Sequence, residues 1–101
     1  MDKNLTKKEI IESVYRQTEL SRVDISALLD IFLDTLFKAL VAGRNIEFRN
    51  FGVFEQQIRK SRVGRNPNCP SHTVVIPEHR VVKFRAGKQL LVAIRDKDSK
   101  H

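Results

Sequence analysis

The chain has 101 residues, of which 41% are hydrophobic and 31% charged, a size for one domain and a composition that excludes disordered and fibrous proteins. Its net charge of +7 favours an anionic partner. The single cysteine, Cys69, excludes an internal disulfide and agrees with a reducing compartment. No apolar run has the length of a membrane span or the form of a secretory signal, so we expect a cytoplasmic protein without a membrane partner.

The positive charge is concentrated between residues 57 and 90. This stretch holds eight Lys or Arg and one acid, Glu78, whereas the rest of the chain holds eleven of each sign. The basic residues are Arg59, Lys60, Arg62, Arg65, Arg80, Lys83, Arg85 and Lys88. A charge this localised indicates a surface that faces an anion, with nucleic acid phosphate as the favoured partner. Charge alone leaves open a ribosomal or merely solvated basic surface.

Two helices are predicted at the start of the chain. Thr6 and Glu9 have the spacing of a capping box, which predicts a helix over about residues 7–17. Ser21 with Asp24 is a weaker start signal for a longer helix, about residues 22–42, for which Gly43 is a natural C-terminal cap. The apolar arc of the second helix is too wide for one small partner helix, so we expect burial on two sides, one of them against a second copy.

After Gly43 the apolar period changes to two, which indicates strands. Ile46 and Phe48 alternate with charged residues, Asn50 to Gly52 marks a tight turn, and residues 53–58 resume as strand. We expect Gly52 to lie where a side chain would clash or where positive φ is needed. Four phenylalanines of this region alternate with Val and Ile, which favours a core role over base stacking; they are Phe48, Phe51, Phe54 and Phe84.

A projecting arm is predicted over about residues 58–77. From Arg59 the alternation loses its apolar face, so neither side of the segment can pack on a core. Residues 66–71 contain two prolines and two asparagines and are predicted as the turn, and residues 73–76 are predicted as the return strand. An unsupported two-stranded ribbon is barely stable in water, so we expect an arm of roughly 30 Å that is mobile when free and ordered when bound.

The end of the chain is predicted to return to the sheet and finish in a short helix. Residues 81–84 read as a strand, and Gly87 precedes a helix over about residues 88–96. Residues 97–101 are predicted to be a frayed tail. The whole chain, residues 1–101, is therefore treated as a single domain.

Four ordered blocks of this sequence resemble the bacterial HU and integration host factor family. They are Asn50–Phe54, Gly64–Pro67, Ile76–Pro77, and Val82–Lys88 with Leu90. The resemblance covers about residues 4–95 and implies an α+β fold with two N-terminal helices, a three-stranded antiparallel sheet with a long β-ribbon arm, and a short C-terminal helix. It also implies an intertwined homodimer, or a heterodimer with a close paralogue.

The resemblance further implies a nucleoid-associated architectural protein that binds and bends double-stranded DNA with low or modest sequence preference. In that family the two arms embrace the minor groove, and a proline at each tip wedges between base pairs; by position this residue is Pro67. The candidate DNA-binding residues are Arg59, Lys60, Arg62, Arg65, Asn66, Pro67, Arg80, Lys83, Arg85 and Lys88. The expected role of the basic ones is to neutralise phosphates rather than to read bases.

The resemblance fails at the arm tip. Family members usually follow the proline with a Thr-Gly turn and a shorter return, whereas here residues 68–72 fill a loop that is one residue longer. Pro70 is therefore a rival to Pro67 as the wedge. The resemblance also does not decide between the HU type and the site-specific type.

Enzymatic and metal-dependent functions find no support in the sequence. His72 and His79 lack further ligands at metal-binding spacing, and no nucleophile, paired carboxylates or phosphate loop appear, so we expect no cofactor, no small-molecule substrate and no catalysis. The alternatives to DNA bending are a dimeric scaffold whose basic arm binds an acidic protein, and a protein whose main ligand is structured RNA.

Overall fold

The computed structural model describes residues 4–99 and divides into two compact units, with the boundary between Lys38 and Ala39 inside the second helix. The chain contributes three helices and five strands within the described range, in the order α1, α2, β1, β2, β3, β4, β5, α3. This α+β composition confirms the predicted fold class. None of the described helices is long and apolar enough to cross a membrane.

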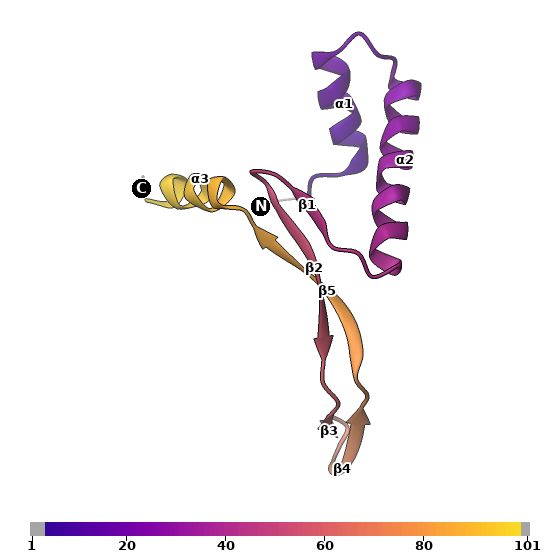
Figure 1. Ribbon diagram of the computed structural model, residues 1–101, viewed down its shortest axis with the longest axis vertical. Helices are drawn as coiled ribbons and strands as arrows, with labels where there is room; N and C mark the ends of the chain where they lie inside the picture. Colours follow the sequence, from indigo (N-terminus) through magenta and orange to yellow (C-terminus); the bar gives the residue numbers. More distant parts are fainter. Residues whose placement is uncertain (1–3, 100–101) are drawn as a thin grey trace. The chain divides into compact units, whose positions relative to one another are not determined.

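The first unit is a helical hairpin built from α1 (Lys7–Gln17) and most of α2 (Arg22–Val41), shown at the indigo end of the chain in Figure 1. The predicted capping box is present: the Thr6 hydroxyl accepts a hydrogen bond from the Glu9 backbone N–H, and the Glu9 carboxylate accepts one from the Thr6 N–H. The Ser21 hydroxyl likewise accepts from the Asp24 N–H at 3.1 Å, which confirms the weaker start signal.

Charged side chains join the two helices of the hairpin. Arg22 donates two hydrogen bonds to the Glu12 carboxylate, at 2.6 and 3.1 Å, and its guanidinium lies 4.0 Å from the centre of the Tyr15 ring. Lys7 forms a second ion pair, with Asp30. The hydrogen bond from Arg22 lowers the pKa of Glu12 below its ordinary value, because it favours the charged carboxylate.

The hydrophobic core of the described residues is very small. Ile25 is the one hydrophobic side chain in that range that is classed as buried, with 4% exposure. Most apolar residues of α2 remain exposed: Val23, Leu28, Ile31, Phe32, Leu33, Phe37 and Val41. The wide apolar arc predicted for this helix is therefore present and largely uncovered by the other described residues of the chain.

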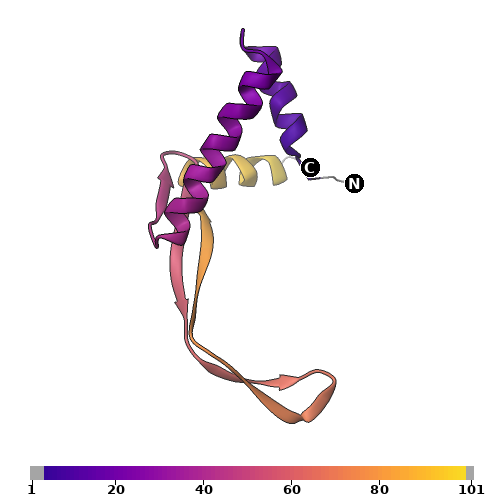
Figure 2. The ribbon, with the colours of Figure 1, turned by 90° about the vertical axis from the view of Figure 1, so that its right-hand side faces the viewer.

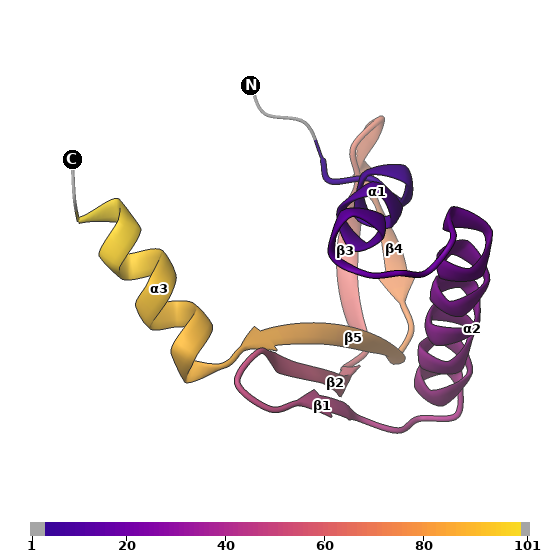
Figure 3. The same ribbon diagram turned by 90° about the horizontal axis from the view of Figure 1, so that it is seen from above.

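The second unit contains a three-stranded antiparallel sheet, a two-stranded ribbon and a helix (Figure 3). The sheet has the order β1 (Ile46–Phe48), β2 (Gly52–Arg59), β5 (His79–Ala86). The ribbon pairs β3 (Arg62–Asn66) with β4 (Cys69–Ile76), and α3 (Lys88–Asp98) follows β5. The predicted sheet and arm are thus confirmed. The last helix is two residues longer than predicted, and residues 100–101 of the predicted tail lie outside the described range.

The register between β2 and β5 gives the sheet two chemically different faces, because directly opposed residues point to the same side. The aromatic face carries Gly52, Phe54, Gln56 and Ile58 of β2 opposite Ala86, Phe84, Val82 and Arg80 of β5. The polar face carries Val53, Glu55, Gln57 and Arg59 opposite Arg85, Lys83, Val81 and His79.

The phenylalanines pack on one another along the aromatic face. The ring centroids of Phe54 and Phe84 are 5.0 Å apart, and those of Phe51 and Phe84 are 5.6 Å apart. Phe51 and Phe84 nevertheless remain exposed, so the predicted aromatic core is not completed by the described residues of this chain.

The end of α2 is fixed by its own backbone and by side chains of the sheet. The Gly43 N–H bonds to the Leu40 carbonyl and the Arg44 N–H to the Ala39 carbonyl, both at 3.0 Å, and Gly43 has φ +88°. This is a Schellman motif, which confirms Gly43 as the cap, although the helix ends one residue earlier than predicted, at Val41. The Gln56 amide donates to the carbonyls of Leu40 and Arg44, at 3.1 and 3.3 Å.

The β1–β2 turn shows why position 52 is glycine. The residue with positive φ in this turn is Asn50, at +70°, and not Gly52. A Cβ on Gly52 would lie 2.6 Å from the Phe84 ring and 2.7 Å from the Arg85 carbonyl oxygen. Of the two reasons expected for this glycine, close approach is therefore the one that applies.

Candidate nucleic-acid interface

The arm continues the β2–β5 pair but is separated from it by a break in the ladder. The β2–β5 pairing ends at Arg59 opposite His79, and the β3–β4 pairing starts at Arg62 opposite Ile76. Two residues on each strand lie between, so the register is kept; one of them is Pro77, which has no N–H to donate. Figure 2 shows the ribbon bending where the two ladders meet.

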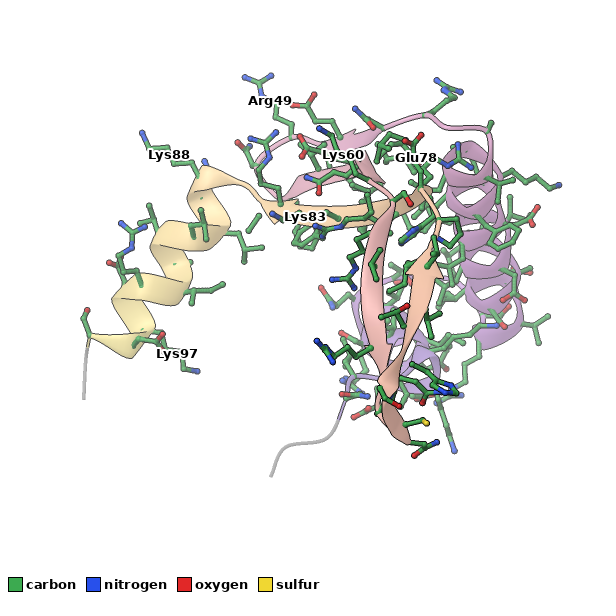
Figure 4. The ribbon with its side chains drawn as sticks, turned by 90° about the horizontal axis from the view of Figure 1, so that it is seen from below. Arg49, Lys60, Glu78, Lys83, Lys88 and Lys97 are labelled. Atoms are coloured by element: carbon green, nitrogen blue, oxygen red, sulfur yellow. The ribbon has the colours of Figure 1, made fainter. Side chains whose placement is uncertain are left out.

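The base of the arm has a concave, basic surface. A pocket there is lined by Arg59, Lys60, Ser61, Arg62, His79 and Val81. Figure 4 shows Lys60 and Glu78 at this point, one from each side of the ribbon, with Lys83 further along β5. Three of the predicted DNA-binding residues therefore gather where the arm leaves the sheet.

The arm tip is tighter than the predicted turn of residues 66–71. Pro67 and Asn68 alone form the turn, because Asn66 pairs with Cys69 and the Asn66 side-chain oxygen accepts from the Asn68 N–H at 2.9 Å. The next pair is Arg65 with Thr73, so residues 70–72 form an irregularity in β4. The extra length of this loop is thus absorbed as a bulge, and the exposed Pro67 lies at the apex.

The β3–β4 ribbon presents cations on both of its faces. Arg62 shares a face with Ile76, whereas Arg65 shares the opposite face with Thr73 and with the pair Val63–Val75. Val63 and Val75 are 68% and 66% exposed, so this part of the arm leaves apolar surface beside its basic side chains.

The three basic residues of β5 do not act alike. Lys83 and Arg85 lie on the polar face, whereas Arg80 lies on the aromatic face and its Nη2 donates to the Val41 carbonyl at 2.8 Å. The guanidinium of Arg80 is thus engaged in capping the C-terminus of α2. Strand alternation could have revealed this from the sequence, because Arg80 has the same parity as Phe84 and the opposite parity to Lys83 and Arg85.

Two further features, one on the polar face and one at the start of α3, complete the candidate site. The Arg85 guanidinium forms an ion pair with Glu55, with Nη2 and Oε2 2.5 Å apart, and sequence reasoning did not single out this glutamate. Lys88 is the first residue of α3, whose N-cap, Gly87, contributes no side-chain hydrogen bond. Free backbone N–H groups at a helix start attract anions, so the Lys88 ammonium and the start of α3 both favour a bound phosphate.

Comparison with known proteins agrees with this geometry. The model of the bacterial DNA-binding protein family matches residues 5–95. The chain belongs to this family. It is 37% identical over 86 residues to a probable DNA-binding protein HU of Chlamydia trachomatis, with 85% of this chain and 86% of the relative covered. It is 33% identical over 88 residues to the integration host factor subunit alpha of Brucella suis, with 87% and 81% covered.

A solved structure shows the same fold. The Anabaena HU chain in a cocrystal with DNA superposes with a TM-score of 0.80 at 31% identity, covering 88% of this chain and 96% of that chain. The predicted family and fold class are therefore confirmed, and the protein is a DNA-binding protein of the HU and integration host factor family, whose members are not enzymes.

Proposed function

We propose that the protein is a dimeric architectural component of the nucleoid that grips the minor groove of duplex DNA with its two arms and bends the duplex. The observation that carries the proposal is the basic β3–β4 arm with an exposed proline at its apex. Relatives named HU and integration host factor support it, as does the likeness to an HU chain bound to DNA. Wedge-driven bending of this kind is known for minor-groove architectural proteins, this family among them.

The uncovered apolar surface of α2 supports the dimer. Ile31 and Phe37 are 64% and 66% exposed, although both are large aliphatic or aromatic side chains on a 20-residue helix. Contiguous exposed apolar surface of this kind marks an interaction site, and chains of this size often complete their core by oligomerisation. A second copy covering α2, Phe51 and Phe84 would supply the missing core. Either an identical chain or a paralogue fits this role.

The proposed DNA contacts all lie in the second unit, with Arg62 and Arg65 on opposite faces of the ribbon. They run from the arm tip through the arm base to the polar face and the start of α3, and comprise Arg59, Lys60, Arg62, Arg65, Asn66, Pro67, Lys83, Arg85 and Lys88. Arg80, the tenth candidate, stays a proposed contact as well: it is exposed, and the hydrogen bond from its Nη2 to the Val41 carbonyl uses one of five N–H donors. Contacts of this type neutralise phosphates, so sequence preference arises from DNA deformability.

Pro67 is the proposed wedge. It is rigid and apolar, loses little conformational freedom on insertion, and has no N–H that would need a partner between bases. Its place in a two-residue turn at the apex supports this role, whereas Pro70 lies in the irregular part of β4.

Bending measured by energy transfer tests the proposal. A short nicked duplex labelled at both ends is titrated with the wild-type protein, Pro67→Ala and the matched control Pro70→Ala. We expect Pro67→Ala to reduce the transfer efficiency at saturation far more than it changes the dissociation constant, and Pro70→Ala to behave as wild type. A wild-type protein that leaves the duplex straight, or binds structured RNA or an acidic polypeptide more tightly, would overturn the proposal.

A further inference from the structure

The polar face of the sheet carries acids among the cations proposed to bind DNA. Glu55 Oε2 accepts from Arg85 Nη2 at 2.5 Å. Since Glu55 lies opposite Lys83 and Arg85 lies opposite Val53, this ion pair runs diagonally between the adjacent strands β2 and β5. The Glu55 side chain is 26% exposed and that of Arg85 is 65% exposed, so the carboxylate lies against the sheet and the guanidinium reaches outward.

A carboxylate in this position occupies the donor that a phosphate would use. Carboxylates and phosphates both accept from a guanidinium through charge-assisted hydrogen bonds, so the two compete for the same group. We propose that Glu55 competes with DNA phosphates for Arg85 and thereby sets how tightly the polar face holds a duplex. This inference rests on the proposed role of the polar face in DNA binding. Glu55 is then a residue that weakens binding rather than one that contacts DNA.

The same face offers a matched control. Glu47 of β1 lies opposite Val53, which in turn lies opposite Arg85, so all three share the polar face. Glu47 and Arg85 are two strand spacings apart, about 10 Å between their Cα atoms. No described residue forms an ion pair with Glu47 within 4.0 Å. Glu47→Gln therefore removes the same charge as Glu55→Gln without releasing Arg85.

The test measures dissociation constants for a nicked duplex, and their dependence on NaCl, with the full-length protein and its variants. We expect Glu55→Gln to bind about threefold to tenfold more tightly than wild type, and at least threefold more tightly than Glu47→Gln. The plot of log K against log salt should steepen by up to about 0.9, the value of one phosphate contact, for Glu55→Gln and not for Glu47→Gln.

Two further variants separate competition from simple charge removal. Glu55→Asp keeps the charge but shortens the side chain by one methylene, so it should also bind more tightly than wild type. In an Arg85→Gln background, Glu55→Gln should raise the affinity for the duplex no more than Glu47→Gln does. The reason is that the guanidinium for which carboxylate and phosphate compete is absent. Thermal unfolding of each variant shows that the sheet is intact.

The outcomes distinguish this inference from the proposed function. If Arg85→Gln and Lys83→Gln both leave the affinity unchanged, the polar face does not bind DNA and both proposals for it fail. If Arg85→Gln weakens binding but Glu55→Gln gains no more than Glu47→Gln, the polar face binds DNA and the competition is refuted. Weaker binding by Glu55→Gln would also refute it, because the carboxylate would then be orienting Arg85 for the phosphate.

Discussion

The α1–α2 hairpin and the β3–β4 arm are stabilised in opposite ways. Within the hairpin, a capping box fixes the start of α1 and ion pairs from Arg22 and Lys7 join the two helices. The arm relies on a single two-stranded ladder, which leaves Val63 and Val75 exposed. A ribbon of two strands is marginal in water. The hairpin is therefore held by contacts between its own helices, whereas the prediction that the arm is mobile when free and ordered on DNA stays a prediction.

The largest expected effect comes from placing a charge on the apolar surface of α2. In the proposed homodimer Phe37→Glu would bury two unpaired carboxylates, one from each copy, at a cost of about 4 kcal/mol each, so the dimer dissociation constant should rise by at least a factor of about a thousand. Sedimentation equilibrium at micromolar concentration measures this directly. Phe37→Leu, which keeps an apolar side chain, should remain dimeric. A Phe37→Glu protein that is still a dimer would show that this surface of α2 does not form the dimer interface.

An intermediate effect is expected from removing one cation of the arm. Arg62→Gln should weaken DNA binding about threefold to tenfold and reduce the steepness of the salt dependence by about 0.9, because one phosphate contact is lost. The unfolding midpoint should stay the same, since Arg62 is an exposed residue of the ribbon.

Lys8→Gln is the matched control for Arg62→Gln in the hairpin. Lys8 is exposed on α1, so this variant removes the same charge from a surface that we do not assign to DNA. It should leave the salt dependence unchanged. Equal losses from Lys8→Gln and Arg62→Gln would mean that net charge, and not the arm, controls binding.

The hairpin and the arm also show which features could be predicted from the sequence. The start of α1 was predicted because Thr6 and Glu9 have the spacing of a capping box, whose hydrogen bonds form between residues close in sequence. Gly43 was recognised as a cap for the same reason. The family was evident from ordered blocks around the arm, and the family match confirms it.

What the sequence did not predict depends on contacts between distant segments. The ion pair of Glu55 with Arg85 joins residues thirty positions apart and requires the register of β2 against β5. The tight turn at Pro67 depends on Asn66 pairing with Cys69, which composition alone does not reveal. Arg80 is a different case, because strand parity placed it with Phe84 and the charge of the region obscured that signal.

The smallest expected effect is a pH dependence of the hairpin through Glu12. Its pKa is lowered from an ordinary value of 4.5 by the hydrogen bond from Arg22, so the folded state favours the charged form. The resulting stabilisation is fully present above pH 4.5 and is lost as the pH falls through the lowered pKa. Glu12→Gln should therefore unfold at a slightly lower temperature than wild type at pH 7, and the difference should shrink as the pH falls below 4.5.

Thermal unfolding between pH 3 and pH 7 measures this difference, with Glu19→Gln as control. Glu19 lies between the two helices and forms no ion pair with a described residue within 4.0 Å, so its variant should follow wild type across the range. An unfolding difference between wild type and Glu12→Gln that is the same at pH 3 and pH 7 would show that this pair does not stabilise the hairpin through its charge. The cation–π contact of Arg22 with Tyr15 and the ion pair of Lys7 with Asp30 would then be the interactions that join α1 to α2, because protonation of Glu12 changes neither of them.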